Sequence, residues 1–289
     1  MFALCLSRAP DFMTEDFYFV RPKTGQRLLL GQRTVPSTQE SIFTTPPRLG
    51  LVISTYGSPA HVALALAVRR KLYPTLPVLV HDDASPEGDA VQQVCQEFDA
   101  EFQTNSARLG HEMGDLSGIV GGLRWAQERG IELLVRMTRR FVPFTDWTVG
   151  LTKLAVAAQA GTYGQVCHKY RFNIRSECVA LYTGHWALPE IAGPMTQYML
   201  NSRERFFVER YLYTLVGKVY EMSCRKALDW ERAHGTIEPR LMYAPWDFLE
   251  TSRVTPSTQY LWHEMATPAS YAQFARKFGL NYPESAFTV

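Results

Sequence analysis

The chain has 289 residues, of which 46% are hydrophobic and 20% charged, and its formal net charge is +2 at pH 7. This is an ordinary globular composition, long enough to bury a sizeable core in one large domain or two small ones. Both signs of charge are spread along the chain and no long basic run occurs, so a nucleic-acid partner is not indicated.

The cysteines and the apolar segments point to a cytoplasmic protein. The five cysteines are an odd number and show no Cys-x-x-Cys spacing, which predicts reduced thiols and not a disulfide frame or a zinc site. No apolar run reaches the ~18 residues of a membrane span. The apolar start, residues 1–10, is too short for the core of a signal peptide, although it leaves a peripheral membrane contact open.

Strand and helix patterns alternate from residue 48 onward. We treat residues 1–47 as an N-terminal extension, because Pro, Thr, Ser and Gln between Thr34 and Pro47 predict an irregular connection. Short apolar runs predict strands at 49–54, 78–80, 101–104 and 131–137. Helices are expected at 60–72, at 87–98, and from Asp115 or Ser117 to 129. This alternation predicts an α/β fold with a mostly parallel sheet flanked by helices.

The pattern becomes mixed after Pro143. Helices are expected at 147–160, 202–221 and 269–278, with strands somewhere within 163–183. The chain is therefore divided into the extension, a half-domain over residues 48–150, and a mixed second half over residues 151–289.

Three strand ends carry side chains suited to a nucleoside diphosphate. Carboxyl ends of parallel strands meet at one edge of a sheet, where ligands of such folds bind. The aromatic ring of Tyr56 can stack on a base, a carboxylate such as Asp82 can bind a base or ribose, and Arg139 and Arg140 can neutralise a diphosphate. Each residue also has a plainer interpretation: a packed loop tyrosine, a helix cap at Asp82, and a solvated arginine pair.

Three segments together resemble the opening of family-2-like glycosyltransferases with the GT-A fold. They are Leu51-Val52-Ile53-Ser54-Thr55-Tyr56-Gly57-Ser58, Tyr73-Pro74 and Val80-His81-Asp82-Asp83-Ala84-Ser85. The resemblance covers about residues 48–145. It implies transfer of a sugar, as in hexosyltransferases of polysaccharide biosynthesis, from a nucleotide diphosphate sugar (UDP-type favoured) to a glycan or other hydroxyl acceptor. It also places the nucleotide-binding residues at Ser54, Thr55, Tyr56, Asp82 and Asp83.

The chain departs from that family at its metal motif. Where the family carries Asp-x-Asp, this chain reads Met137-Thr138-Arg139-Arg140, and position 57 is Gly in place of the usual Asn. Mg²⁺ and Mn²⁺ need hard oxygen ligands, so we expect no conventional divalent-metal cofactor. Either Arg139 or Arg140 replaces the metal as the catalytic cation, or the protein has lost catalysis.

The loop before the third helix borders the diphosphate and sugar in that family. By resemblance, Arg108 or His111 contacts phosphate, and Asp115 or Glu112 contacts sugar hydroxyls. We assign Arg108 to the nucleotide site and His111 and Asp115 to the donor sugar, with an ordinary loop and cap as the alternative. The nearby Gly118-x-x-Gly121-Gly122 lacks the Gly-x-Gly spacing of a dinucleotide motif and is set aside.

An inverting transferase needs a carboxylate base for the acceptor hydroxyl. Phe206-Phe207-Val208-Glu209-Arg210 resembles the region that supplies it, which makes Glu209 the leading candidate and Glu204 the reserve; a mixed-charge surface helix is the alternative. His185 and Trp186 are candidates for an acceptor wall, with core packing of Trp186 equally compatible.

Three functions compete on this evidence. The first is a metal-independent glycosyltransferase, and the second is a non-catalytic nucleotide-sugar or glycan-binding homologue, which the missing metal carboxylates favour. A nucleotidyltransferase is the weakest, because no Gly-rich, Lys-containing phosphate loop follows the first strand.

Overall fold

The computed structural model describes residues 12–20, 27–36, 41–164, 175–189, 191–193, 195, 196, 208, 209, 212, 243–246, 259–263 and 266–288. Its strands are β1 (Phe12–Val20), β2 (Arg27–Pro36), β3 (Leu49–Thr55), β4 (Val78–Asp82), β5 (Glu101–Thr104), β6 (Leu133–Thr138), β7 (Val142–Pro143), β8 (Thr162–Gly164), β9 (Cys178–Tyr182), β10 (Tyr243–Pro245) and β11 (Tyr260–Leu261). Its helices are α1 (Pro59–Leu72), α2 (Gly88–Glu97), α3 (His111–Glu128), α4 (Thr148–Ala158), α5 (Thr183–Trp186), α9 (Pro268–Lys277) and the 3-10 turn η4 (Glu284–Phe287).

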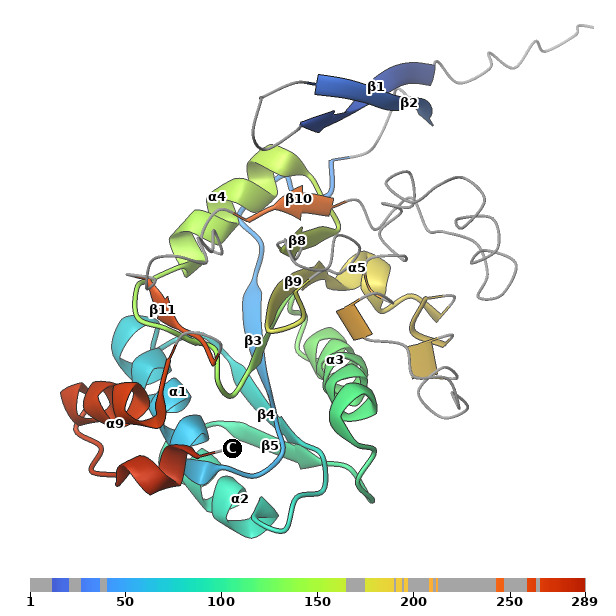
Figure 1. Cartoon of the computed structure of the whole chain (residues 1–289). Coiled ribbons are helices and arrows are strands. Elements are labelled where there is room, and N and C mark those ends of the chain that lie inside the picture. The colour runs from blue at the N-terminus through green and yellow to red at the C-terminus, as the bar shows by residue number, and fades with distance from the viewer. Residues whose placement is uncertain are drawn as a thin grey trace, which may run out of the picture.

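A seven-stranded sheet organises the main body, in the order β10-β8-β9-β6-β3-β4-β5 (Figure 1). β3 pairs in parallel with β4 and β6, and β4 pairs in parallel with β5. β9 is antiparallel to both β6 and β8, so within the described sheet it alone runs against the others. The prediction of an α/β fold with a mostly parallel sheet and a mixed second half is confirmed.

Helices cover both faces of this sheet because its central strands are apolar on both sides. Leu51 and Ile53 of β3 pack in one core with residues of α1, α2 and α4, whereas Val52 packs in a second core with residues of α3 and Trp186 of α5. α3 lies very close to the sheet: a Cβ on its Gly118 would stand 2.3 Å from Ser54 Oγ. The glycines of α3 therefore allow close packing on β3.

The C-terminal segment returns to the carboxyl edge of the sheet. α9 and η4 pack on α1 through a third core that includes Tyr271 and Phe287. β11 pairs antiparallel with β7, just after the end of β6. This brings residues 259–263 next to the end of β6 from more than a hundred positions away.

The structure changes three details of the predicted elements. Within the extension, β1 and β2 form an antiparallel hairpin, which lies near α4 and β10 in Figure 1 and was not predicted. Phe43, before the boundary at residue 48, is buried in the core of the main body. α3 begins at His111, earlier than predicted, because the Asp83 carboxylate accepts the N–H groups of Leu109 and Gly110 just before the helix.

Two other predictions concern a helix in the second half of the chain and membrane-spanning segments. The helix expected at 202–221 falls largely outside the described residues. Within that range only residues 208, 209 and 212 are described, and all three are helical. Across the described ranges, no helix is long and apolar enough to cross a membrane.

Candidate functional site

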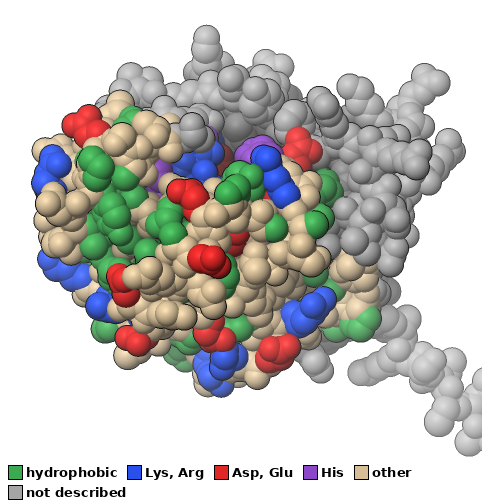
Figure 2. All heavy atoms as spheres, turned by 90° about the horizontal axis from the view of Figure 1, so that it is seen from below, with side chains coloured by type: hydrophobic (Ala, Val, Ile, Leu, Met, Phe, Trp, Pro, Cys, Tyr) green, Lys and Arg blue, Asp and Glu red, His purple; other side chains and the backbone are tan. Residues whose placement is uncertain are grey.

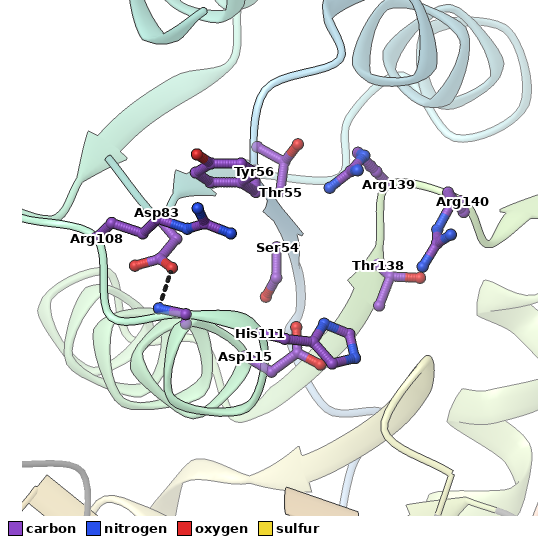
Figure 3. Close-up of a pocket in the computed structure, with 12 residues that line it drawn as sticks. Ser54, Thr55, Tyr56, Asp83, Arg108, His111, Asp115, Thr138, Arg139 and Arg140 are labelled. Carbon is purple, nitrogen blue, oxygen red and sulfur yellow. Dashed lines mark hydrogen bonds between the residues drawn. The ribbon is translucent and has the colours of Figure 1, made fainter. Parts of the chain in front are cut away.

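A pocket lies at the carboxyl ends of β3 and β6, where the strand order reverses. From β3 the chain adds β4 and then β5 on one side, and it returns to add β6 on the other. Ligands of open α/β sheets bind at such a switch point. The residues that line the pocket are Ser54, Thr55, Tyr56, Asp83, Arg108, Gly110, His111, Gly114, Asp115, Thr138, Arg139 and Arg140 (Figure 3). The three predicted strand ends therefore do meet at one edge.

Asp82 supports the pocket from beneath instead of lining it. Its side chain is fully buried, and its two oxygens accept the N–H groups of Gly57 (2.9 Å) and Ser85 (2.7 Å). These bonds fix the turns that follow β3 and β4. Asp82 is therefore held inside the protein, and its contact with the nucleotide stays a prediction.

Asp83 does line the pocket, but its oxygens hold the loop before α3. Asn105 Nδ2 donates to it at 2.7 Å, and the N–H groups of Leu109 and Gly110 donate at 2.9 Å each. The last of these bonds is the dashed line in Figure 3. Asp83 thereby positions Arg108 in the loop and His111 at the first position of α3.

Arg136 is a buried cation that the sequence analysis missed. It is fully buried on β6, where Nε donates to Ser54 Oγ (3.1 Å), Nη1 donates to the carbonyl of Ser176, and Nη2 forms an ion pair with Asp115. One guanidinium thus ties together the end of β3, the start of α3 and the segment before β9. The sequence did hold a signal for this residue: an arginine inside the apolar strand run Leu-Leu-Val-Arg-Met. A charge buried in a strand requires polar partners, so such a residue predicts a buried network.

The arginines that line the pocket lack carboxylate partners. Among the described residues, Arg108, Arg139 and Arg140 take part in none of the ion pairs. Arg139 Nε is buried and has no hydrogen-bond partner among the residues that the structure describes. Burial, followed by the charge of Arg140, lowers the pKa of Arg139. The guanidinium of Arg108 stacks on the ring of Tyr56 at 4.2 Å.

Two histidines near these arginines have lowered pKa values, because of burial and of the nearby positive charges. Burial lowers the pKa of His263 to about 4, with further lowering from Arg140, Arg175 and His111. The pKa of His61 falls to about 3 for the same reason, with contributions from Arg139 and Arg140. Figure 2 shows cationic and histidine side chains gathered around a hollow on the face seen from below. This concentration of unpaired positive charge suits a polyanionic ligand.

The predicted acceptor wall is not part of this pocket. Trp186 is fully buried, and its Nε1 donates to the carbonyl of Gly161 (3.1 Å) and to Thr162 Oγ1 (3.0 Å). Its face is covered by the core, which agrees with the alternative of core packing, and the acceptor role stays a prediction. His185 packs edge-on against Tyr182, at 4.8 Å between ring centroids, and is likewise absent from the pocket lining.

Glu209, the predicted base, is connected to Arg136 through Ser176. Ser176 Oγ donates to Glu209 Oε1 at 2.7 Å, and Ser176 is the residue whose carbonyl accepts from Arg136. Glu204 lies outside the described residues. Beside Ser176, Glu177 is a further, partly buried carboxylate that the sequence analysis did not single out.

The donor set at the end of β6 does not fit a divalent metal ion. The residues there are Thr138, Arg139 and Arg140, and nowhere in the described ranges do three His, Cys, Asp or Glu side chains gather as a metal group. The nearest carboxylates, Asp83 and Asp115, already bind backbone N–H groups or Arg136. Hard cations need free oxygen ligands, which these residues do not offer.

Comparison with known proteins identifies no family by sequence. No family model matches the chain, and no curated protein matches it. Among solved structures, residues 1–349 of S. aureus TarS align with a TM-score of 0.48 and 12% identity over 82% of this chain and 67% of that one. The same fragment in complex with UDP gives 0.45 and 10%, over 82% and 68%.

A third similar structure is the apo-form glycosyltransferase GlyE of Streptococcus pneumoniae TIGR4, with a TM-score of 0.43 and 8% identity over 71% of this chain and 46% of that one. In the longer TarS structure, the chain spans 41% of the length. Because all these likenesses are weak, the function has to be argued from the pocket itself.

Proposed function

We propose that the chain is a glycosyltransferase that takes its sugar from a nucleoside diphosphate sugar and holds the diphosphate with arginines in place of a metal. The observation that carries this proposal is Arg139, whose Nε is buried without a hydrogen-bond partner. It lies in the pocket beside Arg140, and within the described ranges neither arginine forms an ion pair. Two like charges crowded into a pocket at the switch point raise the free energy of the empty protein. A bound diphosphate lowers it through forked hydrogen bonds.

The other walls of the pocket fit the rest of such a donor. Tyr56 lines the pocket, and the guanidinium of Arg108 lies over one face of its ring at 4.2 Å. A flat base such as uracil would stack on the other face. His111 and Asp115 lie on the first turns of α3, across the pocket from Tyr56, where hydroxyls of the donor sugar would meet them (Figure 3). The acceptor is a glycan or another hydroxyl compound.

The chemistry is a direct displacement at the anomeric carbon. The acceptor oxygen forms its bond to that carbon while the bond to the diphosphate oxygen breaks, and the leaving nucleoside diphosphate keeps the electron pair. Negative charge therefore develops on the diphosphate, where fixed cations stabilise the transition state more than the ground state. Arg139 and Arg140, at the end of β6, are the pocket cations assigned to this charge, and a carboxylate, for which Glu209 was predicted, takes the acceptor proton.

A non-catalytic nucleotide-sugar-binding homologue is the second candidate. It is favoured by the fact that Asp83 and Asp115 are both engaged inside the protein. Such a homologue would bind the same donor in the same pocket without breaking its glycosidic bond.

The test is binding and cleavage of UDP-glucose and UDP-N-acetylglucosamine, with and without EDTA. We expect cleavage to survive EDTA. In the double variant Arg139→Gln/Arg140→Gln, affinity should fall by about tenfold or more per arginine, because each charge-assisted bond contributes about 1.5–3 kcal/mol. Arg124→Gln, at an exposed position of α3, is the matched control and should behave as wild type. Binding without cleavage would favour the homologue, and no binding would refute both.

A further inference from the structure

Glu177 lies directly beside the pocket, on the face of the sheet that α3 covers. It precedes β9, and its carbonyl accepts the N–H of the pocket residue Thr138 at 3.0 Å. Successive strand side chains alternate between faces. Cys178 packs in the core with α1 and α2, whereas Val179 packs in the core with α3. The side chain of Glu177 therefore shares the α3 face with Arg136 and Asp115.

Glu177 also carries a carboxylate oxygen that the protein leaves unused. Asp82, Asp83, Asp115 and Glu209 each accept hydrogen bonds from backbone or side-chain donors. By contrast, Glu177 Oε2 is buried and has no hydrogen-bond partner in the described part of the chain. Its Oε1 lies 3.8 Å from Arg175 Nη1, an ion pair too long for a hydrogen bond. A buried acceptor without a donor is costly unless it serves a ligand.

Three charged groups from three different segments surround this carboxylate. Burial raises the pKa of Glu177, and the neighbouring charge of Glu209 raises it further, while Arg175 and Arg136 lower it. The side chain remains 16% exposed, so the protein does not enclose it completely. A carboxylate whose proton affinity is raised above the usual range is better suited to accept a proton in a transition state.

We propose that Glu177 is the general base of the sugar transfer, its free Oε2 taking the proton of the acceptor hydroxyl. This assignment rests on the proposed function. In the step, the acceptor O–H bond breaks and its proton passes to Glu177 Oε2 as the acceptor oxygen bonds to the anomeric carbon. The nucleoside diphosphate departs with the electron pair of the old glycosidic bond, held by Arg139 and Arg140.

Glu209 then becomes a positioning residue and not the base. It is held by Ser176 Oγ at 2.7 Å, and Ser176 directly precedes Glu177 in the chain. The carbonyl of Ser176 accepts a hydrogen bond from the buried Arg136. Both the side chain and the carbonyl of the residue before Glu177 are therefore fixed. Glu209 acts on Glu177 through its negative charge and through this anchoring.

The experiment compares Glu177→Gln, Glu209→Gln and the exposed control Glu128→Gln. UDP affinity is measured first, then release of UDP from UDP-glucose and UDP-N-acetylglucosamine, with water or methyl glycosides as acceptors, between pH 5 and 9. Glu177→Gln should bind UDP like wild type but release it about 10²-fold or more slowly. In wild type the rate should fall as the pH drops through the raised pKa of Glu177, and Glu177→Gln should lose this acidic limb.

A second variant separates catalysis from folding. Formate supplied to Glu177→Ala should restore part of the rate and should leave Glu128→Gln unchanged, an effect that a purely structural role would not produce. A normal rate and pH profile in Glu177→Gln, with UDP binding intact, would overturn the assignment but not the proposed function. UDP binding without any UDP release by wild type would overturn the transferase and, with it, Glu177 as its base, and absence of UDP binding would overturn donor binding at this pocket as well.

Discussion

Replacing Arg136 with Met removes the guanidinium that connects the two halves of the site. The substitution keeps an unbranched apolar stem of similar length but deletes the donors to Ser54 Oγ, the Ser176 carbonyl and Asp115. Arg136 is fully buried, so water cannot replace these bonds at its position. Asp115 is left with an unpaired charge at the start of α3, beside the pocket.

The expected cost follows from the burial of the two partners. Breaking a buried ion pair from one side costs about 3–5 kcal/mol in the free energy of unfolding. Because the side chain of Asp115 is 18% exposed and water can reach part of it, we expect the lower end, about 3 kcal/mol. Removing the second charge in Asp115→Asn/Arg136→Met should recover about 1 kcal/mol or more, since the two residues are in direct contact.

Urea denaturation of wild type, both single variants and the double variant completes the cycle. The control is Arg129→Met, which breaks the ion pair with Glu101, where the side chains are 47% and 43% exposed. Such an exposed pair should contribute less than about 1 kcal/mol. If Arg136→Met costs no more than Arg129→Met, the claim that Arg136 organises the site is wrong.

Three further predictions concern residues around this network. Trp186→Ala should destabilise the fold by about 3–5 kcal/mol, measured by urea denaturation, and should leave the UDP affinity of the folded protein unchanged, because the indole is buried in the core. Gly114→Ala should cost about 1–3 kcal/mol and weaken UDP binding in calorimetry, because a Cβ there would stand 2.6 Å from Asp83 Oδ2 and displace the loop that carries Arg108. The pKa of His61 is lowered from 6.5 to about 3, so the unfolded chain binds the proton more readily, and the free energy of unfolding should fall as the pH drops from 6.5 towards 3. His61→Gln should reduce that slope by up to about 1.4 kcal/mol per pH unit, and an unchanged slope would contradict the assignment.

The parallel half of the fold was predictable because its signals are local. Apolar runs of strand length, such as 49–54 and 78–80, are separated by helical patterns with Pro or Gly at their ends, and each element formed close to its predicted bounds. The meeting of Tyr56, Asp83 and Arg139 then followed from the rule that parallel strands end at one edge.

What escaped the sequence analysis depends on contacts between distant segments. Asp82 was assigned to the nucleotide because its type suited that role, but the bonds to Gly57 and Ser85 depend on how two turns approach each other. Arg136 was hidden in an apolar strand run, since its partners come from three separate segments.

Glu177 and the approach of residues 259–263 to the end of β6 were missed for the same reason. The segment before β9 has no periodic pattern of its own, and its place beside Thr138 is set by antiparallel pairing across the sheet. His263 reaches the pocket arginines only because β11 pairs with β7. No short-range signal in the sequence reports either approach.

The most direct test of the central claim is a crystal structure of the protein grown with UDP and EDTA. The account predicts that the diphosphate lies against the guanidinium groups of Arg139 and Arg140, with no metal ion between them, and that uracil stacks on Tyr56. A diphosphate bound through a metal ion, or a UDP molecule bound away from the ends of β3 and β6, would contradict it.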